Sequence, residues 1–202
     1  MDYKITSRIL LLISGLLLAT TISANEDNLP LMLVNNCMVC HGFQGSSLGP
    51  ATPSIAGIDK KDFVETMEAY KKDEIPSTIM GRIAKGYTNA DFQIMAKYFS
   101  KQAFVRYPQQ VNLDKAKQGA VLHKEFCEKC HQNSGSSFGD EGASILAGQW
   151  MPYLRFNLAD IRANVREMPK KMKIRMEKMV KIHGEDSLEA LIHFYGSQTK
   201  PK

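Results

Sequence analysis

The feature that most constrains this chain is the pattern C-x-x-C-H, which occurs twice, ninety positions apart. The two copies comprise Cys37, Cys40 and His41, and then Cys127, Cys130 and His131. Together they use all four cysteines of the 202-residue sequence. A motif duplicated at this separation indicates two copies of one small unit, each organised around its own motif.

C-x-x-C-H is typical of covalent haem attachment, in which two thiols add to the porphyrin vinyl groups and the histidine binds the iron as proximal ligand. Cysteines three positions apart lie about one helical turn from each other, so both sulfurs reach one edge of the macrocycle. The sequence therefore predicts two covalently bound c-type haems. Their proximal iron ligands are predicted to be His41 and His131.

Three other interpretations of the four cysteines explain the sequence less well than haem attachment does. Two disulfides would suit an exported chain, but they require neither the two-residue spacing nor the following histidine. A zinc site built from both C-x-x-C pairs is compatible with the spacing and leaves both histidines unexplained. A thioredoxin-like redox pair needs a βαβ pattern, and none surrounds either motif.

The sequence similarity extends beyond the cysteines. GSSLG from Gly45 matches GSSFG at an offset of 90, Ala56-Gly57 finds its match at 91, and DFQIMAKYF from Asp91 corresponds to SLEALIHFY at 96. This drift indicates a few inserted residues in the second of two related domains. We predict a first domain over 25–106, a linker over 107–111 in which proline interrupts the helical pattern, and a second domain over 112–202.

The first 24 residues have the features of a cleaved export signal. Lys4 and Arg8 precede the apolar run ILLLISGLLLATTI, and the small residues Ser23 and Ala24 follow it. The run is shorter than the roughly 20 residues of a membrane-spanning helix, and no later segment approaches that length. We therefore expect a periplasmic protein without a transmembrane segment. A formal net charge of +5 is too small to indicate nucleic-acid binding.

The remaining pattern predicts an all-α fold. Asp59 is placed to cap a helix whose Phe63 and Met67 share one face, and Thr88 with Asp91 forms a capping-box pattern before another apolar stripe. No alternating run of strand length occurs. We expect a further helix to begin at Asp114, and the last helix to be capped by Asp186 and to end at Gly196.

An electron-transfer haem takes a sixth ligand, commonly methionine, and the chain has eleven. In the first domain we predict that Met80 is this ligand, since it lies between a loop and the last helix and Gly81 beside it would let the backbone approach the macrocycle. In the second domain we predict Met168, because Pro169 at a helix start leaves it in the preceding loop. Met172 is the next alternative, and Met176 is favoured by counting back from the last helix. The other histidines, expected to be surface or packing residues, are His123, His183 and His193.

Two further interpretations concern the surroundings of these ligands. The carbonyl of Gly49-Pro50 is placed to orient the His41 ring, whereas the second domain has Gly139-Asp140 at that point. Trp150 belongs either to ordinary core packing or, with neighbouring residues, to the surface near a haem edge.

Several runs resemble a known family. NNCMVCHGFQGSSLGPATPSIAG, STIMGRIAKGYTNADF, CEKCH and ILAGQWMPYL are similar to two fused class I cytochrome c domains, and more closely to the cytochrome subunits of flavocytochrome c sulfide dehydrogenases. The resemblance covers the chain from about Asn35 to Tyr195. It implies two tandem domains, each wrapped around one haem, and a separate FAD-bearing subunit that oxidises sulfide.

On this resemblance the chain accepts electrons one at a time from the flavin of its partner and passes them to an external acceptor. It would hold no catalytic site for sulfide, and it contains no G-x-G-x-x-G that would bind flavin. The alternative is a free diheme cytochrome that shuttles electrons to a terminal oxidase. A basic series beginning at Arg162 and ending at Lys181 is either a solvated helix face or a docking site for an acidic redox partner.

Overall fold

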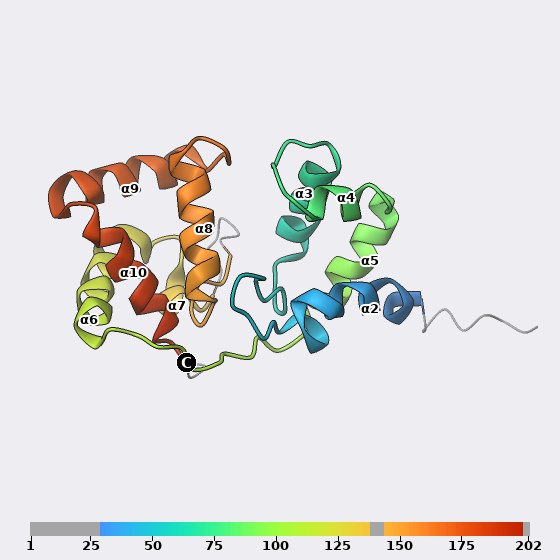
Figure 1. Ribbon diagram of the computed structural model, residues 1–202, viewed down its shortest axis with the longest axis horizontal. Helices are drawn as coiled ribbons and strands as arrows, with labels where there is room; N and C mark the ends of the chain where they lie inside the picture. Colours follow the sequence, from blue (N-terminus) through green and yellow to red (C-terminus); the bar gives the residue numbers. More distant parts are fainter. Residues whose placement is uncertain (1–28, 138–143, 200–202) are drawn as a thin grey trace, which may run out of the picture.

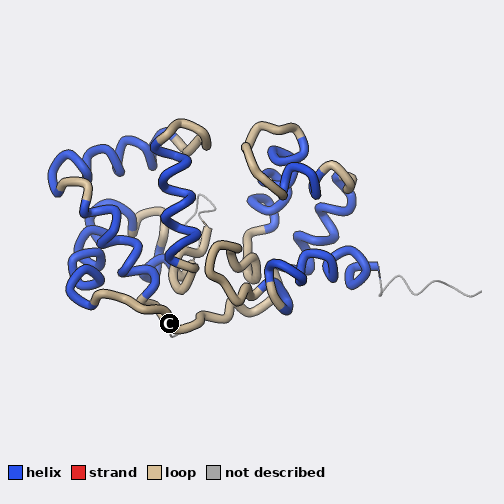
Figure 2. Tube along the Cα trace, viewed as in Figure 1, coloured by secondary structure: helices blue, strands red, loops and turns tan. Residues whose placement is uncertain are grey.

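The computed structural model describes residues 29–137 and 144–199. These residues form two helical bodies joined by an extended segment near residues 103–112 (Figure 1). Helices and loops account for all of the described residues, with no strand among them (Figure 2). The predicted all-α fold is thus confirmed. The predicted export signal at 1–24 and the pair Gly139-Asp140 lie outside the described residues.

The first body is built on one apolar core. Phe92, Met95 and Phe99 from its last helix are fully buried, and Val34 from its first helix packs against them. Its elements are α2 (Leu29–His41), η2 (Phe43–Gly45), α3 (Lys60–Lys71), α4 (Met80–Ala84) and α5 (Asn89–Phe99).

The second body has a similar plan, with the 14-residue α9 in the place of the 5-residue α4. Its first and last helices pack tightly together, and Leu122, Met179 and Phe194 are buried in its core. Its elements are α6 (Leu113–Leu122), η3 (His123–Cys127), α7 (Gln132–Gly135), α8 (Met151–Arg162), α9 (Lys170–His183) and α10 (Asp186–Gly196).

Local sequence rules explain several helix starts. The Asp59 carboxylate accepts from the backbone N–H groups of the first turn of α3, and Thr88 and Asp91 form the predicted capping box at α5. The start predicted at Asp114 is wrong by a short distance: Asn112 caps α6 instead, accepting from two backbone N–H groups. The cap predicted at Asp186 is wrong: Asp186 is the first residue of α10, and no side chain caps that helix, which ends at Gly196 as predicted.

The repeat seen in the sequence is also a repeat of hydrogen bonds. The carbonyl of Gly45 accepts two backbone N–H groups from a later loop, and the carbonyl of Gly135 accepts two from the matching loop. The donors are Ile55 and Ala56 in the first body and Leu146 and Ala147 in the second. Among the described helices, none is long and apolar enough to span a membrane.

Candidate functional site

The first motif lies in the last turn of α2. Cys37 is half-buried, Cys40 is exposed, and His41 is 8% exposed. All four cysteines of the chain lie in described residues, and none is in a disulfide. The helix therefore holds two free thiols one turn apart, with an imidazole directly after them.

A backbone carbonyl orients the His41 ring. Nδ1 of His41 lies 2.8 Å from the carbonyl oxygen of Pro53. The expected partner, Gly49-Pro50, is wrong by a few residues, because the returning loop brings Pro53 to the ring. With Nδ1 donating to this carbonyl, Nε2 is the nitrogen left to bind a metal. Burial lowers the pKa of His41, and the hydrogen bond to Pro53 opposes this, so a neutral imidazole suited to ligation is favoured.

The second motif begins at the end of η3. Nδ1 of His131 lies 3.3 Å from the carbonyl oxygen of Ser144, which matches Pro53 at the offset of 91 found in the sequence repeat. Burial lowers the pKa of His131, while the Ser144 carbonyl opposes the change. Burial also raises the pKa of the Cys127 thiol to about 11, so this thiol is protonated in the protein without haem. Both motifs thus hold their histidine in the same way.

Methionine sulfurs lie on both cores. Met80 is the first residue of α4, half-buried, and packs against the core that also contacts Cys37. Met176 packs in the same manner against the second core, which also contacts Cys127. Met168 lies in the loop before α9, whose N-cap is Pro169, as the sequence predicted.

Met168 and Met176 both line a cavity of about 720 Å³ that runs between the α8–α9 loop, α9 and the start of α10. A volume of this size is in the range of sites that hold a small molecule or cofactor. Met172, the third candidate, is half-buried near the start of α9.

Of the remaining histidines, His123 is 2% exposed. Its Nδ1 is 3.0 Å from the Tyr195 hydroxyl, and its Nε2 pairs with the Glu128 carboxylate, so both ring nitrogens are engaged. His193 accepts the Asn112 backbone N–H at Nδ1. His183 is exposed. These placements agree with packing or surface roles.

The donor set fits haem better than zinc. Each motif offers two thiols and a neutral imidazole whose Nε2 is left for iron, and each core adds a thioether. A zinc site would need four ligands gathered at one point. No group of three or more histidine, cysteine, aspartate or glutamate residues could hold a metal ion within the parts of the chain that the structure describes. The two C-x-x-C pairs therefore do not assemble into a zinc site.

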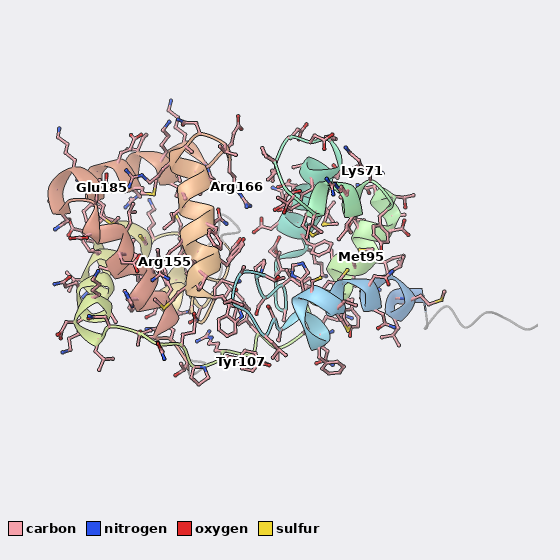
Figure 3. All side chains as sticks on the ribbon, viewed as in Figure 1. Lys71, Met95, Tyr107, Arg155, Arg166 and Glu185 are labelled. Atoms are coloured by element: carbon pink, nitrogen blue, oxygen red, sulfur yellow. The ribbon has the colours of Figure 1, made fainter. Side chains whose placement is uncertain are left out.

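The sequence did not reveal how the two bodies meet. Nε1 of Trp150 donates to the Ser47 carbonyl at 3.0 Å, and Tyr107 stacks on the indole at 6.1 Å between centroids. Gly49 faces the same ring so closely that any Cβ there would lie 2.4 Å from an indole carbon. Trp150 is therefore an interface residue. Arg166, just beyond the far end of α8, projects toward the first body (Figure 3). Burial raises the pKa of Tyr70, and the nearby Arg166 guanidinium opposes that rise.

Comparisons with known proteins agree with this geometry. No family model matches the chain. Cytochrome c-552 of Acidithiobacillus ferridurans is 28% identical over 166 residues, which cover 73% of this chain and 71% of the relative. Cytochrome c4 of Pseudomonas aeruginosa is 26% identical over 158 residues, covering 74% and 78%. The cytochrome subunit of sulfide dehydrogenase of Chlorobaculum tepidum is 40% identical over 65 residues, or 32% of this chain and 57% of that subunit.

Solved structures show the same fold. Reduced cytochrome c4 from Pseudomonas stutzeri superposes with a TM-score of 0.71 at 22% identity and covers 87% of this chain and 100% of that one. A thiosulfate dehydrogenase from Marichromatium purpuratum gives 0.65 at 21% identity, covering 80% of this chain and 36% of that one. The fold is thus that of tandem class I cytochrome c domains. The chain's relatives are cytochromes of the c family, and its fold and duplicated motif support a diheme c-type cytochrome that transfers electrons.

Proposed function

We propose that this chain is the periplasmic, electron-accepting subunit of a flavoprotein sulfide dehydrogenase. It takes electrons one at a time from the FAD of a partner subunit and passes them to an external acceptor. The observation that carries the proposal is the 65-residue stretch at 40% identity to a sulfide dehydrogenase cytochrome subunit, a higher identity than the longer matches to cytochromes c-552 and c4. The chemistry at sulfide and flavin belongs to the partner.

The residues divide into covalent anchors and iron ligands. Haem, when bound, supplies one-electron chemistry at its iron. Cys37, Cys40, Cys127 and Cys130 would hold the two groups by thioether bonds. The axial ligands would be His41 and Met80 in the first domain, and His131 with Met168 in the second, with Met172 or Met176 as alternatives to Met168. The carbonyls of Pro53 and Ser144 hold the two imidazoles in one tautomer, with Nε2 toward the iron.

Packing favours Met176 among the second-domain alternatives. Met176 relates to the core around Cys127 as Met80 relates to the core around Cys37. Single replacements Met168→Ala, Met172→Ala and Met176→Ala test the three alternatives. The ligand variant should lose the far-red methionine-to-iron absorption of one haem only, and the other two variants should keep both signals.

Exposed apolar side chains around the first motif support a permanent partner. Val39, between the two cysteines, is 85% exposed, and Phe43 and Leu48 follow the motif at 77% and 74%. Large apolar side chains exposed this close together in the sequence are typical of an interface. This segment is the proposed contact with the flavoprotein.

The exposed lysines of α9 support a second, transient contact with the external acceptor. Lys170, Lys173, Lys178 and Lys181 are exposed. Arg162, at the end of α8, is paired with Glu185 and is less available. Docking through these lysines predicts that electron transfer to the acceptor slows as ionic strength rises.

The second candidate function is a free diheme carrier. It is favoured by the matches to cytochromes c-552 and c4, which extend over 73% and 74% of the chain. Purification from the native source in mild salt separates the two functions. A sulfide dehydrogenase subunit should co-elute with stoichiometric flavin and be reduced by sulfide. A carrier should elute without flavin and be reduced only by other redox proteins.

A further inference from the structure

The side chain of Gln149 bonds to the first domain from within the second. Its Oε1 accepts the backbone N–H of Ser54 at 3.0 Å, and its Nε2 donates to the carbonyl of Ser54, also at 3.0 Å. Gln149 is 4% exposed and Ser54 is 8% exposed. One amide thus satisfies both backbone polar groups of one buried residue, across 95 positions of sequence. Because the pair is shielded from water, the carboxamide fixes this stretch of backbone firmly.

The two hydrogen bonds from the Gln149 carboxamide form a clamp on Ser54, and Ser54 adjoins the carbonyl that holds the His41 ring. Pro53, whose oxygen lies 2.8 Å from Nδ1 of His41, precedes Ser54 directly. The Pro53 carbonyl and the Ser54 N–H belong to one planar peptide unit. The bond from Ser54 N–H to Gln149 therefore restrains the plane in which the Pro53 oxygen meets the imidazole.

Among the described residues of the second domain, no equivalent clamp is formed. The offset of 91 that relates Pro53 to Ser144 relates Gln149 to Ile58, whose side chain has no hydrogen-bonding atom. The bond from His131 to its carbonyl is also longer, at 3.3 Å against 2.8 Å. The two proximal histidines thus share a partner type but differ in how firmly that partner is held.

We propose that Gln149 is a positioning residue through which the second domain sets the proximal ligand of the first. The inference rests on the proposed role of His41 as an iron ligand. A well-held carbonyl at Nδ1 raises the electron density of the imidazole and favours oxidised iron. Loss of the clamp should weaken that bond and raise the reduction potential of the first-domain haem. The potential of the second-domain haem should stay unchanged.

The test compares Gln149→Met with Gln109→Met in the full-length holoprotein. Gln109, in the linker, bonds to the same part of the second domain, donating to the Gln149 carbonyl at 3.0 Å and accepting from the Met151 N–H at 2.8 Å, but neither bond involves Ser54. Spectroelectrochemistry gives the two midpoint potentials, and paramagnetic NMR of the axial histidines assigns each to its domain. We expect a positive shift of the first-domain potential, and a shifted His41 ring N–H signal, in Gln149→Met alone.

A second variant keeps the proposal testable if Gln149→Met fails to fold. Gln149→Ala leaves room for water to satisfy the Ser54 backbone groups, so it should fold while losing the fixed clamp. We expect a smaller shift in the same direction. The proposal is overturned if neither variant moves the first-domain potential selectively, or if Gln109→Met moves it equally. A haem count below two in the wild-type protein would instead refute the proposed haem sites themselves.

Discussion

Gly119 lies where α6 crosses α10, and its replacement by alanine should destabilise the second domain. A Cβ at this position would lie 2.1 Å from the carbonyl oxygen of Ala190 and 2.7 Å from Cβ of Phe194. The nearest obstacle is backbone, which cannot rotate away as a flexible side chain does. The variant Gly119→Ala must therefore push the two helices apart or distort α10.

The size of the effect follows from two opposing terms. Overpacking a close helix contact costs up to about 3 kcal/mol. Alanine in place of a helical glycine returns about 1 kcal/mol of backbone entropy. The net loss in the free energy of unfolding is then about 2 kcal/mol. With a urea dependence of about 2 kcal/mol per molar for a domain of this size, the midpoint should fall by about 1 M.

Urea titration of the holoprotein, followed by far-ultraviolet circular dichroism and haem absorbance, measures this shift. Gly86→Ala is a matched control, because the nearest atom to a Cβ there is a carbonyl oxygen at an ordinary 3.4 Å. The control should change the midpoint little. An unchanged midpoint in Gly119→Ala would refute the close backbone contact between α6 and α10.

Three further outcomes are expected. Burial, followed by the charges of Asp59 and Glu65, raises the pKa of Asp62 to about 6. The free energy of unfolding should therefore fall as pH rises from about 4 to about 6. Because Asp62 is half-exposed, the variant Asp62→Asn should restore only about 1 kcal/mol at pH 7, measured by thermal unfolding. Thr88→Ala removes the capping box of α5 and should cost about 1 kcal/mol by urea titration. Trp150→Phe loses the bond to a first-domain carbonyl and should let amide hydrogens at the interface exchange faster, measured by mass spectrometry.

Short-range rules carried much of the sequence-based prediction. The attachment motif, the cap at Asp59 and the capping box at Thr88 depend on residues within a few positions of each other, and the caps appear where the sequence placed them. The start of α6 shows the limit of such rules. Asn112 and Asp114 are both good capping residues, and in the structure the Asn112 side chain caps the helix while Asp114 lies in its first turn.

Contacts between residues far apart in the chain could not be predicted from the sequence. The partner of His41 was expected at Gly49-Pro50 and is Pro53, because the path of the loop decides which carbonyl reaches the ring. Gln149 and Trp150 stood out only as part of a family-like run. Their roles depend on how the two bodies pack, and neither residue type nor spacing encodes that arrangement.

The internal repeat explains why the proximal side of each site was easier to predict than the distal side. From the cysteines to the carbonyls of Pro53 and Ser144 the offset changes only from 90 to 91, so one domain predicts the other. The offset between the two copies rises further, to 96, between these carbonyls and the last helices. This region contains α4, with 5 residues, in the first domain and α9, with 14, in the second. Insertions in this region leave the methionine ambiguous when counted forward from the motif. Straight numbering back from α10, at the offset of 96, pairs Met80 with Met176, the pairing that their packing on the two cores also favours.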